Sequence, residues 1–268
     1  MPPIVQKGTI KGVVKEARKP RRDKGQMRWT PRDLAALLWI GEQYAVRLDQ
    51  LAVLLARLSS APTQTPGMLR EDTVYKLVKR WEQAGVVKYA VLLSQTPSWV
   101  WLTREGLEQV GLSYRFWKPK AQGLAHLYAV NQARLEIEQR YPTAIWRSER
   151  HLNSERGFSR KQARGPHRPD AEVEVEGRRM AVEVELSDKV SGRLAAILYE
   201  LARTYAGTWY FCPPATKGLV QRAIEQLNPP AVRQKFLLVA LSTEGDRNTR
   251  RTTPHPPPPP GREAAGEA

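Results

Sequence analysis

Hydrophobic and polar positions in the first third of the chain predict three helices followed by two strands. Apolar residues recur at helical spacing in three segments, at residues 30–41, 48–58 and 71–84. Thr30 and Pro31 begin the first segment with a capping residue and a residue suited to the first helical position. Two strand-like runs follow, at residues 86–93 and 99–102, with a turn of Ser, Thr and Pro between them.

This order of elements predicts a winged helix-turn-helix domain, in which the third helix enters the major groove and the hairpin contacts the flanking DNA backbone. Four bases on the third helix and the first strand are the expected DNA contacts, Lys76, Lys79, Arg80 and Lys88. Two alternatives stay open, because exposed bases on a helix are often only solvated and winged helices also bind proteins.

The second part of the chain has the pattern of an α/β sheet. A helix over residues 122–140 and a short strand over residues 144–147 come first. Apolar and polar residues then alternate through two strands that turn at residues 176–178, which gives one apolar and one acidic face. A helix, a strand, a second helix and a last strand complete the pattern, at residues 189–206, 208–211, 215–227 and 235–242. The predicted fold class is therefore α/β, with a winged helix-turn-helix followed by a sheet of mixed direction.

The length of the chain predicts two domains, and its charge predicts a polyanionic binding partner. The 268 residues include 43 Lys and Arg against 27 Asp and Glu, a net charge of +16. We place the domains at residues 29–112 and 113–245, between a flexible basic arm (1–28) and a disordered proline-rich tail (246–268). Double-stranded DNA is the expected partner. An anionic membrane surface is second, because the bases do not line one amphipathic helix.

The remaining composition indicates a reducing compartment and no membrane span. The longest apolar run, residues 34–40, is far shorter than the ~20 residues of a spanning helix. No apolar segment follows the basic N-terminus, and Cys212 is the single cysteine, so no internal disulfide is possible. A cytoplasmic location is therefore expected.

The sign of the charge changes abruptly within the second domain. Residues 142–168 hold seven bases and two acids, whereas residues 169–188 hold seven acids and two bases. Like charges on one sheet face repel each other, so such a cluster needs either solvent or a positive partner. For Glu172, Glu174 and Glu176 we expect a solvated outer surface.

Asp170, Glu183 and Glu185 are interpreted differently, because they precede a helix that begins with Lys189 and Arg193. Mg²⁺ typically binds one or two carboxylates together with phosphate oxygens. Such a metal polarises a phosphodiester and lowers the pKa of an attacking water. We therefore predict a metal site with the ligands Asp170, Glu183 and Glu185, beside a phosphate held by Lys189 and Arg193. A structural cluster of salt bridges is the alternative.

These residues resemble a known motif. Pro-Asp at positions 169–170 and Glu-Val-Glu at positions 183–185 resemble the PD-(D/E)xK motif of restriction-endonuclease-like nucleases, with a glutamate where the motif has lysine. The wider pattern, with Lys189 and Arg193 at four-residue spacing and a winged helix upstream, resembles the replication-relaxation family and the related MobC-class plasmid relaxases.

The resemblance covers residues 30–242 and implies a restriction-endonuclease-like second domain. It implies a protein that binds the origin of a plasmid or integrative element and nicks one strand with Mg²⁺ or Mn²⁺. Mobilisation or replication proteins are the protein partners that it implies. The implied catalytic residues are Asp170, Glu183, Glu185, Lys189, Arg193 and, more loosely, Tyr210.

Two other functions stay open at this point. Leu194 stands where the relaxases have a tyrosine, which favours a catalytically inactive accessory or replication-initiation protein that keeps the fold to bind DNA. A winged-helix transcriptional regulator is the second alternative. The four histidines are scattered, and His126 is expected to be a packing or surface residue.

Overall fold

The computed structural model describes residues 28–59, 67–155, 167–187 and 193–241. Residues 1–27 of the predicted arm, the whole proline-rich tail and Lys189 lie outside them. Among the described helices, none has both the length and the apolar character needed to cross a bilayer.

The predicted three helices and hairpin are present in residues 28–112, which we call the N-terminal unit. Its elements are α1 (Pro31–Glu42), β1 (Ala45–Arg47), α2 (Leu48–Arg57), α3 (Glu71–Gln83), β2 (Val87–Ala90), β3 (Trp99–Leu102) and α4 (Arg104–Gln109). The expected cap of α1 is a capping box, in which the Thr30 hydroxyl accepts from the Asp33 amide and the Asp33 carboxylate accepts from the Thr30 amide. The strands form an antiparallel sheet in the order β1-β3-β2.

Residues 124–241, which we call the C-terminal unit, form a five-stranded sheet of mixed direction, as the sequence predicts. Its elements are α5 (Leu124–Arg140), β4 (Ile145–Ser148), α6 (Glu149–Glu155), β5 (Ala171–Val175), β6 (Arg178–Val184), α7 (Leu194–Thr204), β7 (Gly207–Cys212), α8 (Pro214–Glu225), the 3-10 helix η2 (Pro230–Lys235) and β8 (Phe236–Ala240). The strand order is β4-β5-β6-β7-β8; the first three strands are antiparallel, and β7 and β8 continue in parallel to β6.

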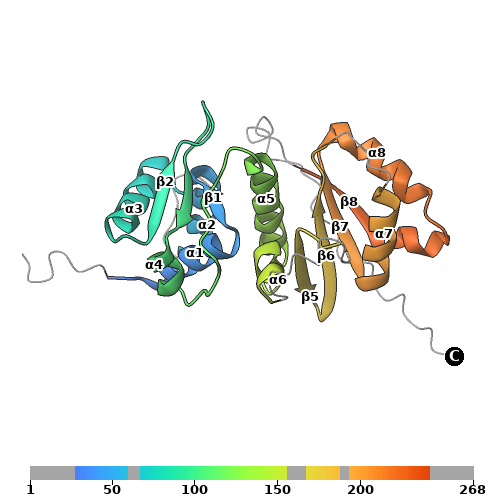
Figure 1. The fold of residues 1–268 in the computed structure, drawn as a ribbon, viewed down its shortest axis with the longest axis horizontal. Helices are drawn as coiled ribbons and strands as arrows, with labels where there is room; N and C mark the ends of the chain where they lie inside the picture. The colour runs from blue at the N-terminus through green and yellow to red at the C-terminus, as the bar shows by residue number, and fades with distance from the viewer. Residues whose placement is uncertain (1–27, 60–66, 156–166, 188–192, 242–268) are drawn as a thin grey trace, which may run out of the picture.

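The predicted hairpin of the second domain turns at two residues with left-handed backbone, Glu176 (φ 51°) and Gly177 (φ 70°). Such a two-residue turn matches the right-handed twist of the strands it joins. One face of the sheet packs against α5, and the other is covered by α7 and α8 (Figure 1). Alternation along β6 therefore directs Val182 toward α5 and Glu183 toward the α7 side.

The expectation that Glu172 is solvated is wrong. Its side chain is buried, accepts a hydrogen bond of 2.7 Å from the Tyr205 hydroxyl and forms an ion pair of 2.9 Å with Arg147. The reason is that Tyr205, at the end of α7, covers this part of the acidic face. Glu174 and Glu176 are exposed, as expected.

Helix α5 is the element of the C-terminal unit that faces the N-terminal unit, and it contributes to both cores (Figure 1). Leu135 packs into the core of the N-terminal unit, whereas Ala133 and Ile137 pack onto the large sheet. Buried polar contacts tie α5 to the N-terminal unit, because the Asn131 amide donates to the Ala45 carbonyl at 2.9 Å. The two units are thus joined by a shared helix.

Candidate functional site

Two of the predicted site residues, Asp170 and Glu183, meet at one edge of the large sheet. Asp170 directly precedes β5, and Ala171 pairs with Val182 in the antiparallel register. Continuing that register by one residue places Asp170 opposite Glu183. The Asp170 carboxylate is held on both oxygens, since Oδ1 lies 2.7 Å from Nε2 of His126 and Oδ2 accepts from the Val184 amide at 2.8 Å.

Glu183 is buried and has a histidine partner of its own. Its Oε1 lies 2.7 Å from Nε2 of His167. Burial, and after it the charge of Asp170, raise the pKa of Glu183 to about 7 against the opposing effect of His167 and His126. We call His126, His167, Asp170 and Glu183 the carboxylate–histidine cluster.

Both histidines of this cluster hold protons more tightly than a free imidazole. Burial alone would lower the pKa of His126, but the hydrogen bond and charge of Asp170 raise it overall. The hydrogen bond to Glu183 raises the pKa of His167. Both imidazoles therefore favour their protonated form beside the carboxylates of Asp170 and Glu183.

Glu185 and Tyr210 lie next to this cluster. The Glu185 Oε1 accepts from the Ser187 amide at 2.9 Å, so its carboxylate turns toward its own loop. Tyr210 pairs with Glu183 across β6 and β7 and is buried under α7 and α8. Burial and the charges of Glu183, Glu185 and Asp170 raise the pKa of Tyr210, so its phenol stays protonated and is a poor nucleophile in this arrangement.

The predicted phosphate-binding pair is described only in part. Arg193 caps the N-terminal end of α7 and is exposed, whereas Lys189 lies outside the described residues. Four of the six predicted catalytic residues are therefore brought together, namely Asp170, Glu183, Glu185 and Tyr210.

The carboxylates fit one kind of metal site and not another. Within residues 28–59, 67–155, 167–187 and 193–241, no group of three or more His, Cys, Asp or Glu side chains is arranged to hold a metal ion. Glu185 therefore does not complete an all-protein cage with Asp170 and Glu183. A Mg²⁺ ion bound by two carboxylates, with phosphate oxygens and water completing its shell, remains compatible with this pair. The pKa of Glu183 is raised first by burial and then by the charge of Asp170, and a bound cation would oppose both effects.

The predicted DNA contacts on the N-terminal unit differ in how they are held. Lys76 and Lys88 are exposed. Lys79 lies over the rings of Tyr75 and Tyr89, at 5.7 and 4.9 Å from their centroids. Arg80 instead donates to the fully buried carboxylate of Asp33 at 2.8 Å, so it fixes α3 to α1.

Sequence reasoning missed both histidines of the cluster. His167 stands three residues before Asp170, and this proximity was the available signal. His126 comes from α5, 44 residues earlier, and only the tertiary fold brings it to Asp170.

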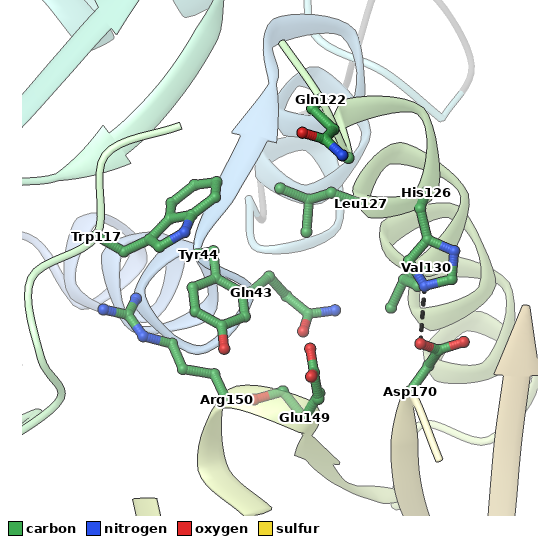
Figure 2. Close-up of a pocket in the computed structure, with 12 residues that line it drawn as sticks. Gln43, Tyr44, Trp117, Gln122, His126, Leu127, Val130, Glu149, Arg150 and Asp170 are labelled. Carbon is green, nitrogen blue, oxygen red and sulfur yellow. Dashed lines mark hydrogen bonds and ion pairs between the residues drawn. The ribbon is translucent and has the colours of Figure 1, made fainter. Parts of the chain in front are cut away.

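A cavity of about 250 Å³ opens beside the cluster (Figure 2). His126 and Asp170 form one side of it, and the other sides come from the α1–β1 turn, the segment before α5 and the start of α6.

Comparison with known proteins gives no match. No protein-family model, no curated protein and no solved structure matches this chain.

Proposed function

We propose that this chain is a DNA-binding protein that recognises an origin through a winged helix and nicks one strand with Mg²⁺ or Mn²⁺. The observation that carries the proposal is the position of Asp170, which directly precedes β5, accepts from the Val184 amide and lies opposite Glu183 of β6 when the strand register is continued by one residue. This is the relation expected of the two acidic residues of a PD-(D/E)xK motif, one before a strand and one on the next.

The order of elements supports the same proposal. From α5 to β7 the order is a helix, three antiparallel strands with the short α6 between the first two, a crossover helix and a parallel strand. This order resembles the core of restriction-endonuclease-like folds. In the N-terminal unit, three helices and a small antiparallel sheet resemble a winged helix, with α3 at one end of the molecule and on the side away from α5 (Figure 1).

In this proposal each of the described residues would have a separate role in binding or catalysis. Asp170 and Glu183 would hold the metal, and His126 and His167 would orient their carboxylates. A bound divalent cation would polarise the phosphodiester and lower the pKa of a water. Arg193 would contact the phosphate, and Lys76 and Lys88 would contact the DNA backbone.

A protein that binds the origin without cutting is the second candidate. Two observations favour it. Both oxygens of Asp170 already have partners in the fold, and Glu185 stands where a PD-(D/E)xK nuclease has lysine.

Metal binding separates these two candidates. We expect Mn²⁺ to raise the melting temperature of the wild type, because a ligand that binds only the folded state stabilises it by about 1.4 kcal/mol at ten times its dissociation constant. That corresponds to a shift of about 2–4 °C for a chain of this size. Glu183→Gln should abolish the shift, whereas Glu174→Gln, an exposed carboxylate on the neighbouring strand, should retain it. The non-cutting candidate would be favoured if Mn²⁺ raised the melting temperature equally in the wild type and both variants. It would also be favoured if Mn²⁺ raised none of the three melting temperatures, whether duplex DNA was present or absent.

A further inference from the structure

The cavity beside the cluster is lined by α5, by Asp170 and by three further parts of the chain. Gln43 and Tyr44 come from the turn between α1 and β1, Trp117 from the segment before α5, and Glu149 and Arg150 from the start of α6. Figure 2 shows these side chains around a common space, with the hydrogen-bonded pair of His126 and Asp170 at its edge. A molecule bound there would therefore lie next to the proposed metal ligands.

Two aromatic rings form one wall of the cavity and are held in place. The rings of Tyr44 and Trp117 lie 5.1 Å apart between centroids and are tilted by 51°. The Arg150 guanidinium lies 4.8 Å from the Tyr44 centroid and donates to the carbonyls of Gly41 and Arg115. The wall is thus a fixed aromatic surface on which a planar ring can stack.

The polar lining includes a buried donor that has no partner. Gln43 is only 2% exposed, and its Nε2 makes no hydrogen bond within the described residues. Figure 2 shows its amide directed into the space between Glu149 and Val130. An unpaired buried N–H is costly, so an acceptor on a ligand would recover free energy here. The Glu149 carboxylate on the same lining can accept from an amino group.

We propose that this cavity binds one unpaired nucleobase of a DNA strand whose neighbouring phosphate lies at the carboxylate–histidine cluster. A nucleobase combines a planar face, which stacks on Trp117 and Tyr44, with an edge of donors and acceptors that meets Gln43 and Glu149. The volume of about 250 Å³ is below the range of drug-sized ligand sites and suits a single heteroaromatic group. This inference rests on the proposed function, since it takes the ligand to be the strand that is cut.

Fluorescence anisotropy with short single strands tests this proposal. One fluorescein-labelled strand has mixed sequence, and a second has the same length and phosphates but carries abasic residues. We expect the wild type to bind the first strand about 5- to 150-fold more tightly, the range for stacking of one base on an aromatic side chain. Trp117→Ala and Gln43→Leu should each reduce this preference. Phe116→Ala is the matched control, because Phe116 is the exposed aromatic neighbour of Trp117 that does not line the cavity.

Equal binding of both strands by the wild type would overturn the proposal, as would full preference in both cavity variants. Gln43→Leu replaces the buried side chain with one of similar size. If Trp117→Ala fails to fold, the base preference of Gln43→Leu therefore tests the proposal. Competition with free deoxynucleoside monophosphates tests whether the cavity binds a free nucleotide and not a base of a DNA strand. If they bind as tightly as the strand, the cavity is a nucleotide site and the strand is excluded as its ligand. All titrations contain chelator and no metal, so the measured base preference does not depend on whether the protein nicks DNA. A protein that nicks DNA normally but shows no base preference would contradict the proposal of a nucleobase site and leave the proposed nicking function standing.

Discussion

At the level of single residues, the buried carboxylates of this chain have two kinds of partner. Glu172 is compensated by the Arg147 guanidinium and the Tyr205 hydroxyl, which are stable partners at neutral pH. Glu183 has an imidazole partner, and its pKa is raised to about 7 by burial and by Asp170. The first arrangement is that of a structural ion pair, and the second is the kind of perturbed carboxylate that the proposed function requires.

Glu172→Gln should destabilise the fold without affecting the cluster. The amide keeps the shape of the side chain but loses the charge-assisted hydrogen bonds to Arg147 and Tyr205, so we expect the free energy of unfolding to fall by about 1–3 kcal/mol. Glu174→Gln on the same strand should change it by less than about 0.5 kcal/mol, because Glu174 is exposed. Urea denaturation measures both values. Equal losses in the two variants would contradict the assignment of Glu172 as a buried partner.

Cys212 should be unreactive in the folded protein. Its side chain is fully buried, and burial raises the pKa of the thiol, so little thiolate is present at pH 8. We expect no reaction with a chromogenic disulfide reagent within minutes under native conditions, and one thiol per chain in denaturant. Rapid native reaction would show that β7 is accessible where we describe it as packed.

The alternation of apolar and polar residues predicted the two faces of the hairpin, but it did not predict which carboxylates are buried. Glu172 and Glu174 lie two residues apart and share a face, so their local patterns are the same. The difference between them is made by Tyr205, which lies 33 residues after Glu172 and covers only one of them. For the same reason, the distant partner His126 could not be read from the residues around Asp170.

At the level of elements, α3 combines residues that fix it with residues that face solvent. Arg80 anchors α3 to Asp33 at the start of α1, and Tyr75 contacts Tyr89 of β2 through their hydroxyls at 3.3 Å. Lys76 and Lys88 are exposed on α3 and β2. The helix is therefore held in a fixed orientation while Lys76 stays accessible to solvent.

Lys76→Ala combined with Lys88→Ala should weaken DNA binding without loss of stability. Each lysine that neutralises one phosphate contributes about 1 to the slope of log affinity against log salt, so the double variant should lower the slope by about 2. Binding of a duplex measured across a salt series gives this value. An unchanged slope would place the DNA interface elsewhere.

Arg80→Ala should act differently, because it leaves the fully buried Asp33 without its closest cationic partner. We expect a loss of about 2 kcal/mol in the free energy of unfolding, measured by urea denaturation. A variant with full stability and weakened DNA binding would instead make Arg80 a direct contact.

The sequence predicts most elements but misses short ones, among them β1, α6 and the 3-10 helix η2. The helices and strands that carry a clear period of apolar residues are found within a few residues of their predicted ends. β1 is missed because its three residues run directly into α2 without a turn signal. α6 is missed because it has seven mostly polar residues inside a basic segment. α6 contributes Glu149 and Arg150 to the cavity beside the cluster, and Gln43 and Tyr44 of its lining directly precede β1, so the cavity could not be predicted either.

At the level of the whole molecule, α5 joins the two units through buried polar contacts. Arg134 is 6% exposed, pairs with Glu42 of α1 at 2.7 Å and with Glu138 at 2.6 Å, and lies 4.7 Å from the Trp39 ring. The Trp39 indole in turn donates to Glu138 at 3.0 Å. Separation of the units would expose this network, so we expect them to unfold as one.

Arg134→Ala should therefore lower the stability of both units together. We expect a single transition in wild type, with coincident tryptophan fluorescence and circular dichroism, and a loss of about 3 kcal/mol in the variant. Arg140→Ala, an exposed arginine in the last turn of α5, is the control and should have little effect. Two separate transitions in the wild type would show that α5 does not couple the units.

A nicking assay tests the central claim most directly. Supercoiled plasmid that carries the candidate origin would be incubated with the protein and Mg²⁺ or Mn²⁺, beside Asp170→Ala, Glu183→Ala and the control Glu174→Ala. We predict open-circular product cut at a single site, retained in the control and lost in both cluster variants and with chelator. Plasmid that is bound and shifted but stays supercoiled in every lane would contradict the claim of cleavage and leave a DNA-binding protein that does not cut.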